Sequence, residues 1–169
     1  MRPKPEDHIS YFSRYIDLVP ENDIMSALKN DHHTFIEFVK TIPAEKSEHF
    51  YAPGKWTIKQ VLNHIIDTER IFSYRALRFA RADAQAVAGF EENDYAANAN
   101  LKHTDLNLLM EEFDVVRQAT ILLFRQLEEK ELLRKGMMAS GETNVLSLGF
   151  TICGHAKHHI NVIKKDTCN

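Results

Sequence analysis

The sequence has few of the features that mark secreted or membrane-spanning proteins. Only two of its 169 residues are cysteines and they form no CxxC pair, so a disulfide framework is not expected. The longest aliphatic runs, such as ILLF at 121–124, are too short to cross a bilayer, and the first residues lack the apolar stretch of a signal peptide. These absences predict a cytoplasmic protein that has no membrane partner.

An excess of basic residues is also absent. The 21 lysines and arginines are outnumbered by 24 aspartates and glutamates, which gives a formal net charge of −3. Nucleic-acid binding usually needs a basic surface, so we expect no nucleic-acid partner. The chain is 44% hydrophobic and 27% charged, a globular composition, and its length suits one domain over residues 1–169.

Several catalytic motifs are missing as well. The chain contains no P-loop, no GxGxxG, no GxSxG nucleophile elbow and no HExxH zinc motif. It also contains no ExxH, the motif that supplies ligands to di-iron sites in ferritin-like bundles. Any metal site must therefore be built from a different set of side chains.

Four long segments show the apolar spacing of amphipathic helices, and no segment shows a convincing strand pattern. The predicted helices cover residues 24–42, 57–83, 105–131 and 144–165. Thr57 and Gln60 predict a capping box at the start of the second helix. This pattern predicts an all-α protein whose core is a four-helix bundle.

Two connecting segments add to the bundle. Residues 10–19, SYFSRYIDLV, predict a short N-terminal helix or a strap across the bundle. Residues 84–104 form a long loop between the second and third helices, and loops of this length often cover a functional site. The second and third connections are long enough for a crossover, so the order of the helices in space stays open.

The last helix carries two histidines in an apolar stripe. His155 and His159 are four residues apart and therefore share a face, whereas His158 lies about a quarter turn to one side. Burying imidazole is costly unless its nitrogens find partners, and a shared metal ion provides one. Such a pair also arises by chance in a chain with nine histidines, so the spacing alone does not establish a metal site.

A third ligand must come from another helix. His64, on the second helix, can face the bundle interior, although an isolated core histidine is more often structural than a ligand. Asp67 and Glu69 are the carboxylate alternatives nearby. Glu69 also falls on the apolar arc of this helix, where a charged group needs a partner.

The second helix is rich in arginine. Arg75 lies on the same strip as His64, about three turns further along, and is our candidate cofactor-binding residue. Its alternative role is to hold the GFEENDY stretch of the loop through a carboxylate. The other arginines, at 70, 78 and 81, share a polar face; we expect a solvated surface there, with an anion pocket as the alternative.

Four stretches, in this order, resemble the DinB/YfiT-like superfamily, which is associated with metal-dependent enzymes. They are YAPGKWTIKQVLNHIIDTERIFSYRALRFAR, GFEENDY, EEFDVVRQATILLFRQL and GHAKHHINVIKK. The most specific features are the tryptophan before the second helix, the histidine eight residues later and the C-terminal HxxHH. The resemblance implies a four-helix bundle, often dimeric, in which three histidines hold a divalent metal.

Placed on this sequence, the resemblance assigns the ligands as His64, His155 and His159. It implies zinc or nickel, with manganese or iron as further candidates, and for some members a low-molecular-weight thiol as cosubstrate. We therefore expect a homodimeric transferase or hydrolase that activates a small thiol or water for attack on a small-molecule substrate. The alternative is a non-catalytic bundle that binds a ligand or partner and holds a structural metal.

Overall fold

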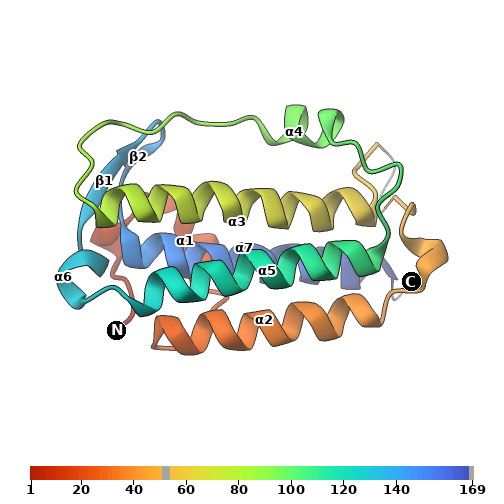
Figure 1. The fold of residues 1–169 in the computed structure, drawn as a ribbon, viewed down its shortest axis with the longest axis horizontal. Helices are drawn as coiled ribbons and strands as arrows, with labels where there is room; N and C mark the ends of the chain where they lie inside the picture. The colour runs from red at the N-terminus through yellow and green to blue at the C-terminus, as the bar shows by residue number, and fades with distance from the viewer. Residues whose placement is uncertain (51–53, 168–169) are drawn as a thin grey trace.

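The structure, a computed structural model, describes residues 1–50 and 54–167. Four long helices run side by side (Figure 1): α2 (Ile24–Lys40), α3 (Ile58–Ala80), α5 (Leu106–Arg125) and α7 (Val145–Thr167). Thr57 accepts a hydrogen bond from the backbone N–H of Gln60, and the Gln60 side chain accepts one from the backbone N–H of Thr57. The predicted four-helix bundle and the capping box are therefore confirmed.

The long loop sets the topology of the bundle. It runs back along the whole length of α3, so α3 and α5 point the same way, opposite to α2 and α7 (Figure 1). Helix α7 packs against both α2 and α3, and α5 packs against the same two helices. The connections from α2 to α3 and from α5 to α7 therefore cross the bundle diagonally, an order that the helix periodicity left open.

The shorter elements differ in part from the prediction. The N-terminal segment is a helix, α1 (Ser10–Ile16), preceded by the 3-10 turn η1 (Pro5–Asp7), and a second turn, η2 (Ala44–Lys46), follows α2. The loop contains α4 (Glu92–Asn98). The third long helix was predicted to reach residue 131 but ends at Arg125, because Glu128 and Glu131 form the capping box of a separate helix, α6 (Glu129–Leu132).

The all-α prediction holds for the bundle, but the structure adds a short hairpin that no sequence pattern indicated. Strands β1 (Lys135–Met138) and β2 (Gly141–Asn144) form an antiparallel hairpin between α6 and α7. Strands of four residues are too short to show alternation in sequence. Gly136 lies against the ring of Phe79, where a Cβ would collide, and Gly141 has φ +128°, so both glycines are required for the hairpin.

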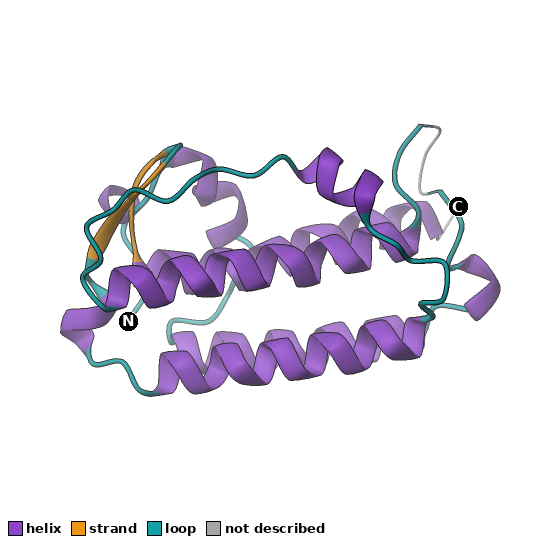
Figure 2. Ribbon diagram, turned by 45° about the horizontal axis from the view of Figure 1, so that its top comes forward, coloured by secondary structure: helices purple, strands orange, loops and turns teal. Residues whose placement is uncertain are grey.

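The hairpin also fixes the long loop. The backbone N–H of Val87 donates to the Met137 carbonyl, and the N–H of Ala139 donates to the Val87 carbonyl. Figure 2 shows the strand pair and α4 on the same side of α3, joined by this loop. The loop is thus held at its start by the hairpin and lies over one face of the bundle.

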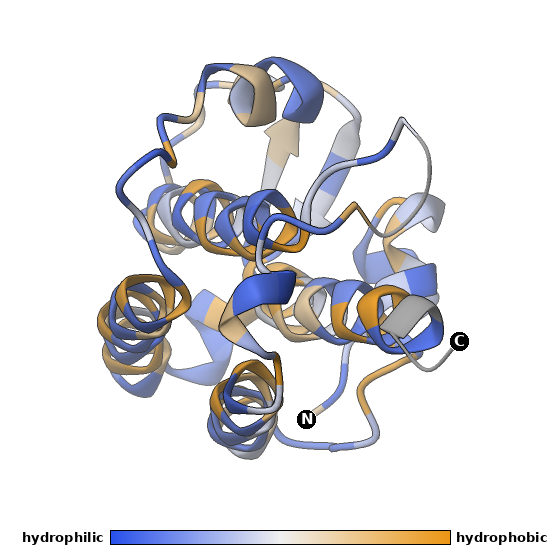
Figure 3. Cartoon of the chain, turned by 90° about the vertical axis from the view of Figure 1, so that its right-hand side faces the viewer, coloured by the Kyte–Doolittle hydropathy of each residue, from blue (hydrophilic) through white to orange (hydrophobic). Residues whose placement is uncertain are grey.

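Helix α1 approaches α7 closely because residue 154 is glycine. A Cβ at that position would collide with the Tyr15 backbone carbonyl. The apolar residues of the long helices face inward (Figure 3) and form two buried clusters, one around Phe79 and Phe150 and one around Phe35 and Phe113. Among the described residues, no helix is both long and apolar enough to span a bilayer.

Candidate metal centre

Helix α7 places its histidines deep in the bundle. Asn144 caps the helix by accepting a hydrogen bond from the backbone N–H of Ser147, at 2.8 Å. Every residue from 143 to 156 is buried, so this half of the helix has no solvent-facing side. His155 falls at the end of this stretch with 6% of its surface exposed, and His159 follows one turn later. A polar ring in such surroundings needs a partner inside the protein.

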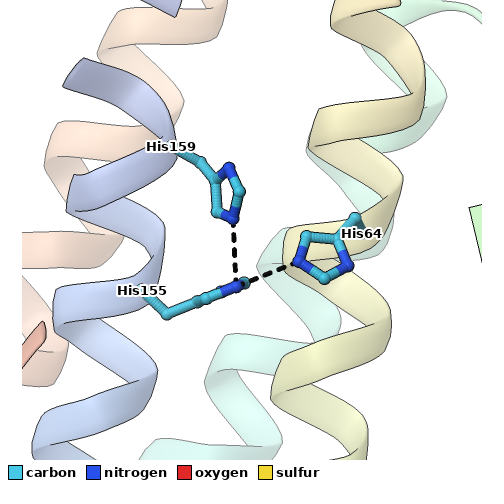
Figure 4. Close-up of side chains that lie close together, drawn as sticks. All are labelled: His64, His155 and His159. Atoms are coloured by element: carbon cyan, nitrogen blue, oxygen red, sulfur yellow. Dashed lines mark hydrogen bonds between the residues drawn. The ribbon is translucent and has the colours of Figure 1, made fainter. Parts of the chain in front are cut away.

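The three predicted ligands converge on one point (Figure 4). The Nε2 atoms of His64 and His155 are 3.0 Å apart, and those of His159 and His155 are 3.1 Å apart. One ligand atom from each residue can be chosen so that all three lie within 4.8 Å of one another. In tetrahedral zinc coordination, with Zn–N near 2.05 Å, neighbouring ligand nitrogens are about 3.3 Å apart. Two of the three spacings are close to this value and the third is within 4.8 Å, so the imidazoles lie near the arrangement of ligands around one ion.

Hydrogen bonding alone does not satisfy this arrangement. Each imidazole nitrogen either donates one hydrogen or accepts through one lone pair. His155 Nε2 faces the Nε2 atoms of both His64 and His159, so a single hydrogen bond leaves the second contact unsatisfied. A metal ion would accept a lone pair from each ring, which makes this donor set suitable for a divalent cation.

The protonation states also suit metal ligands. Burial lowers the pKa of His64 to about 4. Burial, together with the neighbouring His64 imidazole, lowers the pKa of His159 to about 3, and burial places the pKa of His155 well below its usual value. All three rings are therefore neutral at pH 7, and their lone pairs are available.

The carboxylate alternatives lie elsewhere. Asp67 accepts a hydrogen bond from Asn63 at 2.8 Å and pairs with Arg70 at 3.6 Å. Glu69 is five residues from His64, which turns it about 140° away around the helix. Neither belongs to the histidine group. His158 is also outside the group and packs against the Tyr15 ring at 5.6 Å, as its predicted position at the edge of the stripe requires.

A cavity of about 570 Å³ opens beside the three histidines. Helix α1 contributes Tyr11, Phe12, Arg14 and Tyr15 to its wall, and the segment at the start of α4 contributes Phe90, Glu92 and Asn93. Sequence reasoning did not single out the α1 residues, because their nearness to the histidines depends on the close α1–α7 contact at Gly154. A small molecule can therefore reach the imidazole nitrogens from this cavity.

Arg75 lies next to this cavity rather than on the surface. Its side chain is 7% exposed, and its Nη2 donates to the Ala88 carbonyl at 2.8 Å. Arg75 thus touches the loop, through a backbone carbonyl instead of the carboxylates considered above. Two of the remaining arginines form ion pairs, Arg70 with Glu112 and Arg78 with Asp83, as expected of a solvated polar face.

One cluster of charged residues was not predicted. Arg117 donates to both carboxylate oxygens of Glu69 at 2.8 Å, to Asp31 Oδ2 at 2.7 Å and to the Leu28 carbonyl at 3.1 Å. All three charged side chains are buried. The sequence does contain a signal for these buried charges. Asp31 and Arg117 fall within the apolar stripes of their helices, four residues from Phe35 and Phe113 respectively.

A helical bundle in which three neutral imidazoles from two helices meet beside a cavity could hold one divalent metal ion. The chain belongs to the DinB superfamily, whose family model matches residues 27–163. The family expected from the sequence is therefore confirmed.

Two known proteins are similar to this chain, one in sequence and one in structure. A protein of Oceanobacillus iheyensis, provisionally named a metal-dependent hydrolase, is 26% identical over an alignment of 133 residues that covers 76% of this chain and 74% of that protein. YfiT from Bacillus subtilis, described as a probable metal-dependent hydrolase with an unusual four-helix bundle topology, matches with a TM-score of 0.77. That match covers 99% of this chain and 93% of YfiT at 17% identity, so it shows a shared fold.

Proposed function

We propose that this protein is a metal-dependent enzyme in which His64, His155 and His159 hold one divalent ion, zinc or nickel. The convergence of three Nε2 atoms beside a cavity of about 570 Å³ carries this proposal. Three protein ligands leave coordination positions for water or substrate, as in catalytic rather than structural zinc sites. The names given to the relatives from Oceanobacillus and Bacillus point the same way.

The bound ion would lower the pKa of a water or thiol in the cavity and so supply a nucleophile near neutral pH. The chain itself fixes the imidazoles. His155 is held edge-on against the Tyr15 ring, with ring centroids 5.4 Å apart, and His64 packs against Trp56 at 4.8 Å. These contacts hold the rings in orientations that direct their Nε2 atoms at one point.

The cavity has aromatic walls as well as polar ones. Phe12, Phe72 and Phe90 line this cavity together with the histidines. Polar contacts at the metal are stronger in such a low-dielectric setting than in bulk solvent. We therefore propose that the reacting group of a small-molecule substrate lies at the histidines and that its apolar part lies against these rings.

Metal content tests the ligand set directly. The protein is purified without a metal-affinity column, and bound metals are measured by mass spectrometry in the wild type, His64→Ala and His155→Ala. His158→Ala is the matched control, because it removes an imidazole one residue from His159 but outside the group. We expect about one equivalent in the wild type and the control and almost none in the two ligand variants. Metal that persists in either ligand variant rejects the site.

The nucleophile is then identified by turnover of the metal-loaded protein. Activated esters and a chlorinated aromatic electrophile are offered with and without a small thiol. Hydrolysis without thiol supports water as the nucleophile, and a thioether product formed only with thiol supports the transferase. If neither reaction depends on His155, the proposal of catalysis fails although the metal site stands.

A further inference from the structure

One face of α3 connects the histidines to a second cavity. His64, Thr68 and Phe72 are spaced four residues apart on this face and line the first cavity. Phe72 and Arg75 line a neighbouring cavity of about 380 Å³. Phe12 and Phe90 line both cavities as well. The two cavities therefore lie in line along α3, with the backbones of His64 and Arg75 about 16 Å apart along the helix axis.

No carboxylate in the described part of the chain compensates the charge of Arg75. Among residues 1–50 and 54–167, its guanidinium forms no ion pair. It donates to the Ala88 carbonyl at 2.8 Å and to the Met138 thioether at 3.8 Å, and a thioether is a weak acceptor. A guanidinium has five N–H donors, and a buried cation normally requires an anionic partner.

The surroundings of Arg75 suit an anionic group of low charge. The guanidinium lies 5.2 Å from the Phe72 ring and 5.8 Å from the Phe90 ring, so apolar walls strengthen its attraction for an anion. Of the described residues that line the second cavity, Arg75 alone is charged, and Ser10 and Ser140 add hydroxyl groups. One cation matches one carboxylate, whereas a doubly charged phosphate monoester would keep an uncompensated charge.

We propose that the second cavity binds the carboxylate of an elongated substrate or cosubstrate whose reacting end lies at the histidines. This inference rests on the proposed metal-dependent function for the identity of the reacting end. The planar guanidinium recognises the carboxylate through paired hydrogen bonds, and the aromatic walls between the cavities contact an apolar spacer. Arg75 thus selects the class of ligand, and it takes no part in the chemical step.

A series of thiols with a terminal carboxylate tests this inference. Mercaptoalkanoates from mercaptopropanoate to mercaptoundecanoate are titrated into the zinc-loaded protein by calorimetry, beside mercaptoalcohols of equal length. The thiol binds at the metal, and only the longer chains reach Arg75. We expect the carboxylate to bind at least about tenfold more tightly than the alcohol at one of the longer lengths and equally at the shortest.

The variants locate the effect. Arg75→Gln should reduce the preference for carboxylate to near unity, and Arg75→Lys should retain part of it. Arg81→Gln is the matched control: it removes one positive charge at the end of the same helix but does not line either cavity. Equal preference for carboxylate in the wild type and Arg75→Gln, at every chain length, overturns the inference and leaves the metal site intact.

A metal-free experiment separates this inference from the proposed function. Alkanoates without a thiol are titrated into the zinc-free protein, with alkanols of equal length for comparison. A carboxylate preference that depends on Arg75 supports the second site even if the histidines bind no metal. Its absence, in a protein that binds zinc at the histidines, rejects the second site alone. If Arg75→Gln does not fold, the same comparison is made with Arg75→Lys and the wild type.

Discussion

Two buried polar clusters lie close together along α3, and they differ in how their groups are satisfied. The ion cluster, consisting of Asp31, Glu69 and Arg117, is closed: the guanidinium binds both carboxylates. The histidine cluster, consisting of His64, His155 and His159, opens onto a cavity and leaves one nitrogen contact unsatisfied. We infer that the ion cluster holds the helices together. The histidine cluster is arranged to bind a partner that the chain itself does not supply.

The two buried arginines show the same contrast. Arg117 is fully buried between two carboxylates, with ion pairs at 2.7 and 2.8 Å. Arg75 is almost as deeply buried, but within residues 1–50 and 54–167 it donates only to a carbonyl and a thioether. A buried charge paired inside the protein stabilises its neighbours, whereas an unpaired charge at a cavity is free to bind a ligand. Burial alone therefore does not distinguish a structural residue from a functional one.

The largest expected effect is the loss of Arg117. Arg117→Met leaves two buried carboxylates without a counter-charge, and we expect the free energy of unfolding to fall by about 3–5 kcal/mol. Urea denaturation measures it. Arg125→Met, on the exposed face of the same helix, is the control and should change stability by less than about 0.5 kcal/mol.

A neutral version of the ion cluster sharpens this test. Combining Arg117→Met with Asp31→Asn and Glu69→Gln removes all three charges and should recover much of the lost stability. A small loss in Arg117→Met, comparable to that of the control, would show that the ion cluster is not what holds α2, α3 and α5 together.

Metal should stabilise the protein through the histidine cluster. A ligand that binds only the folded state adds about 2.7 kcal/mol at a free concentration one hundred times its dissociation constant. We expect zinc to raise the free energy of unfolding by this order in the wild type and in His158→Ala, but not in His155→Ala. Denaturation with zinc and with a chelator measures the difference. Equal stabilisation of His155→Ala by zinc would place the metal elsewhere.

The two clusters should respond to pH with opposite sign in the metal-free protein. Burial lowers the pKa of His64 from 6.5 to about 4, so its contribution to stability is complete above pH 6.5 and is lost as pH falls through about 4. Burial raises the pKa of Asp31 from 3.8 to about 6, so its contribution is complete below pH 3.8 and is lost as pH rises through about 6.

Variants separate these opposing contributions between pH 4 and 6. His64→Ala should flatten the rise of stability with pH, because one buried imidazole no longer resists protonation. Asp31→Asn should steepen the same rise, because the opposing group is gone. The slope of unfolding free energy against pH is the readout, since Asp31→Asn also lowers stability at every pH by weakening the contact to Arg117. Unchanged slopes in both variants would contradict the assigned pKa shifts.

Much of this architecture was predictable from local pattern. The apolar stripes of the long helices, the capping box at Thr57 and the shared face of His155 and His159 depend on residues within a few positions of one another. The third ligand was less certain. The helical periodicity placed His64 inside the bundle but could not say which helix it faced. The resemblance to known proteins supplied that choice.

The remaining features depend on contacts between distant segments. The hairpin was missed because its strands are four residues long and its fit relies on Gly136 lying against Phe79. The ion cluster joins residues 31, 69 and 117, and Glu69 was recognised only as a charge that needed a partner. Helix α1 lines the cavity because Gly154 allows α1 to approach α7 closely. Such long-range fits leave no periodic signal in the sequence.

The smallest expected effect on stability completes the comparison between the arginines. Arg75→Met breaks no ion pair with any residue that the structure describes, and a methionine can still pack against Phe72 and Phe90. The Ala88 carbonyl lies on an exposed residue, where water can replace the lost donor. We expect the free energy of unfolding to change by less than about 1 kcal/mol in urea denaturation, beside a large loss for Arg117→Met. A loss as large as that of Arg117→Met would make Arg75 a structural clamp between the loop and the hairpin, and would remove the reason to regard its charge as available to a ligand.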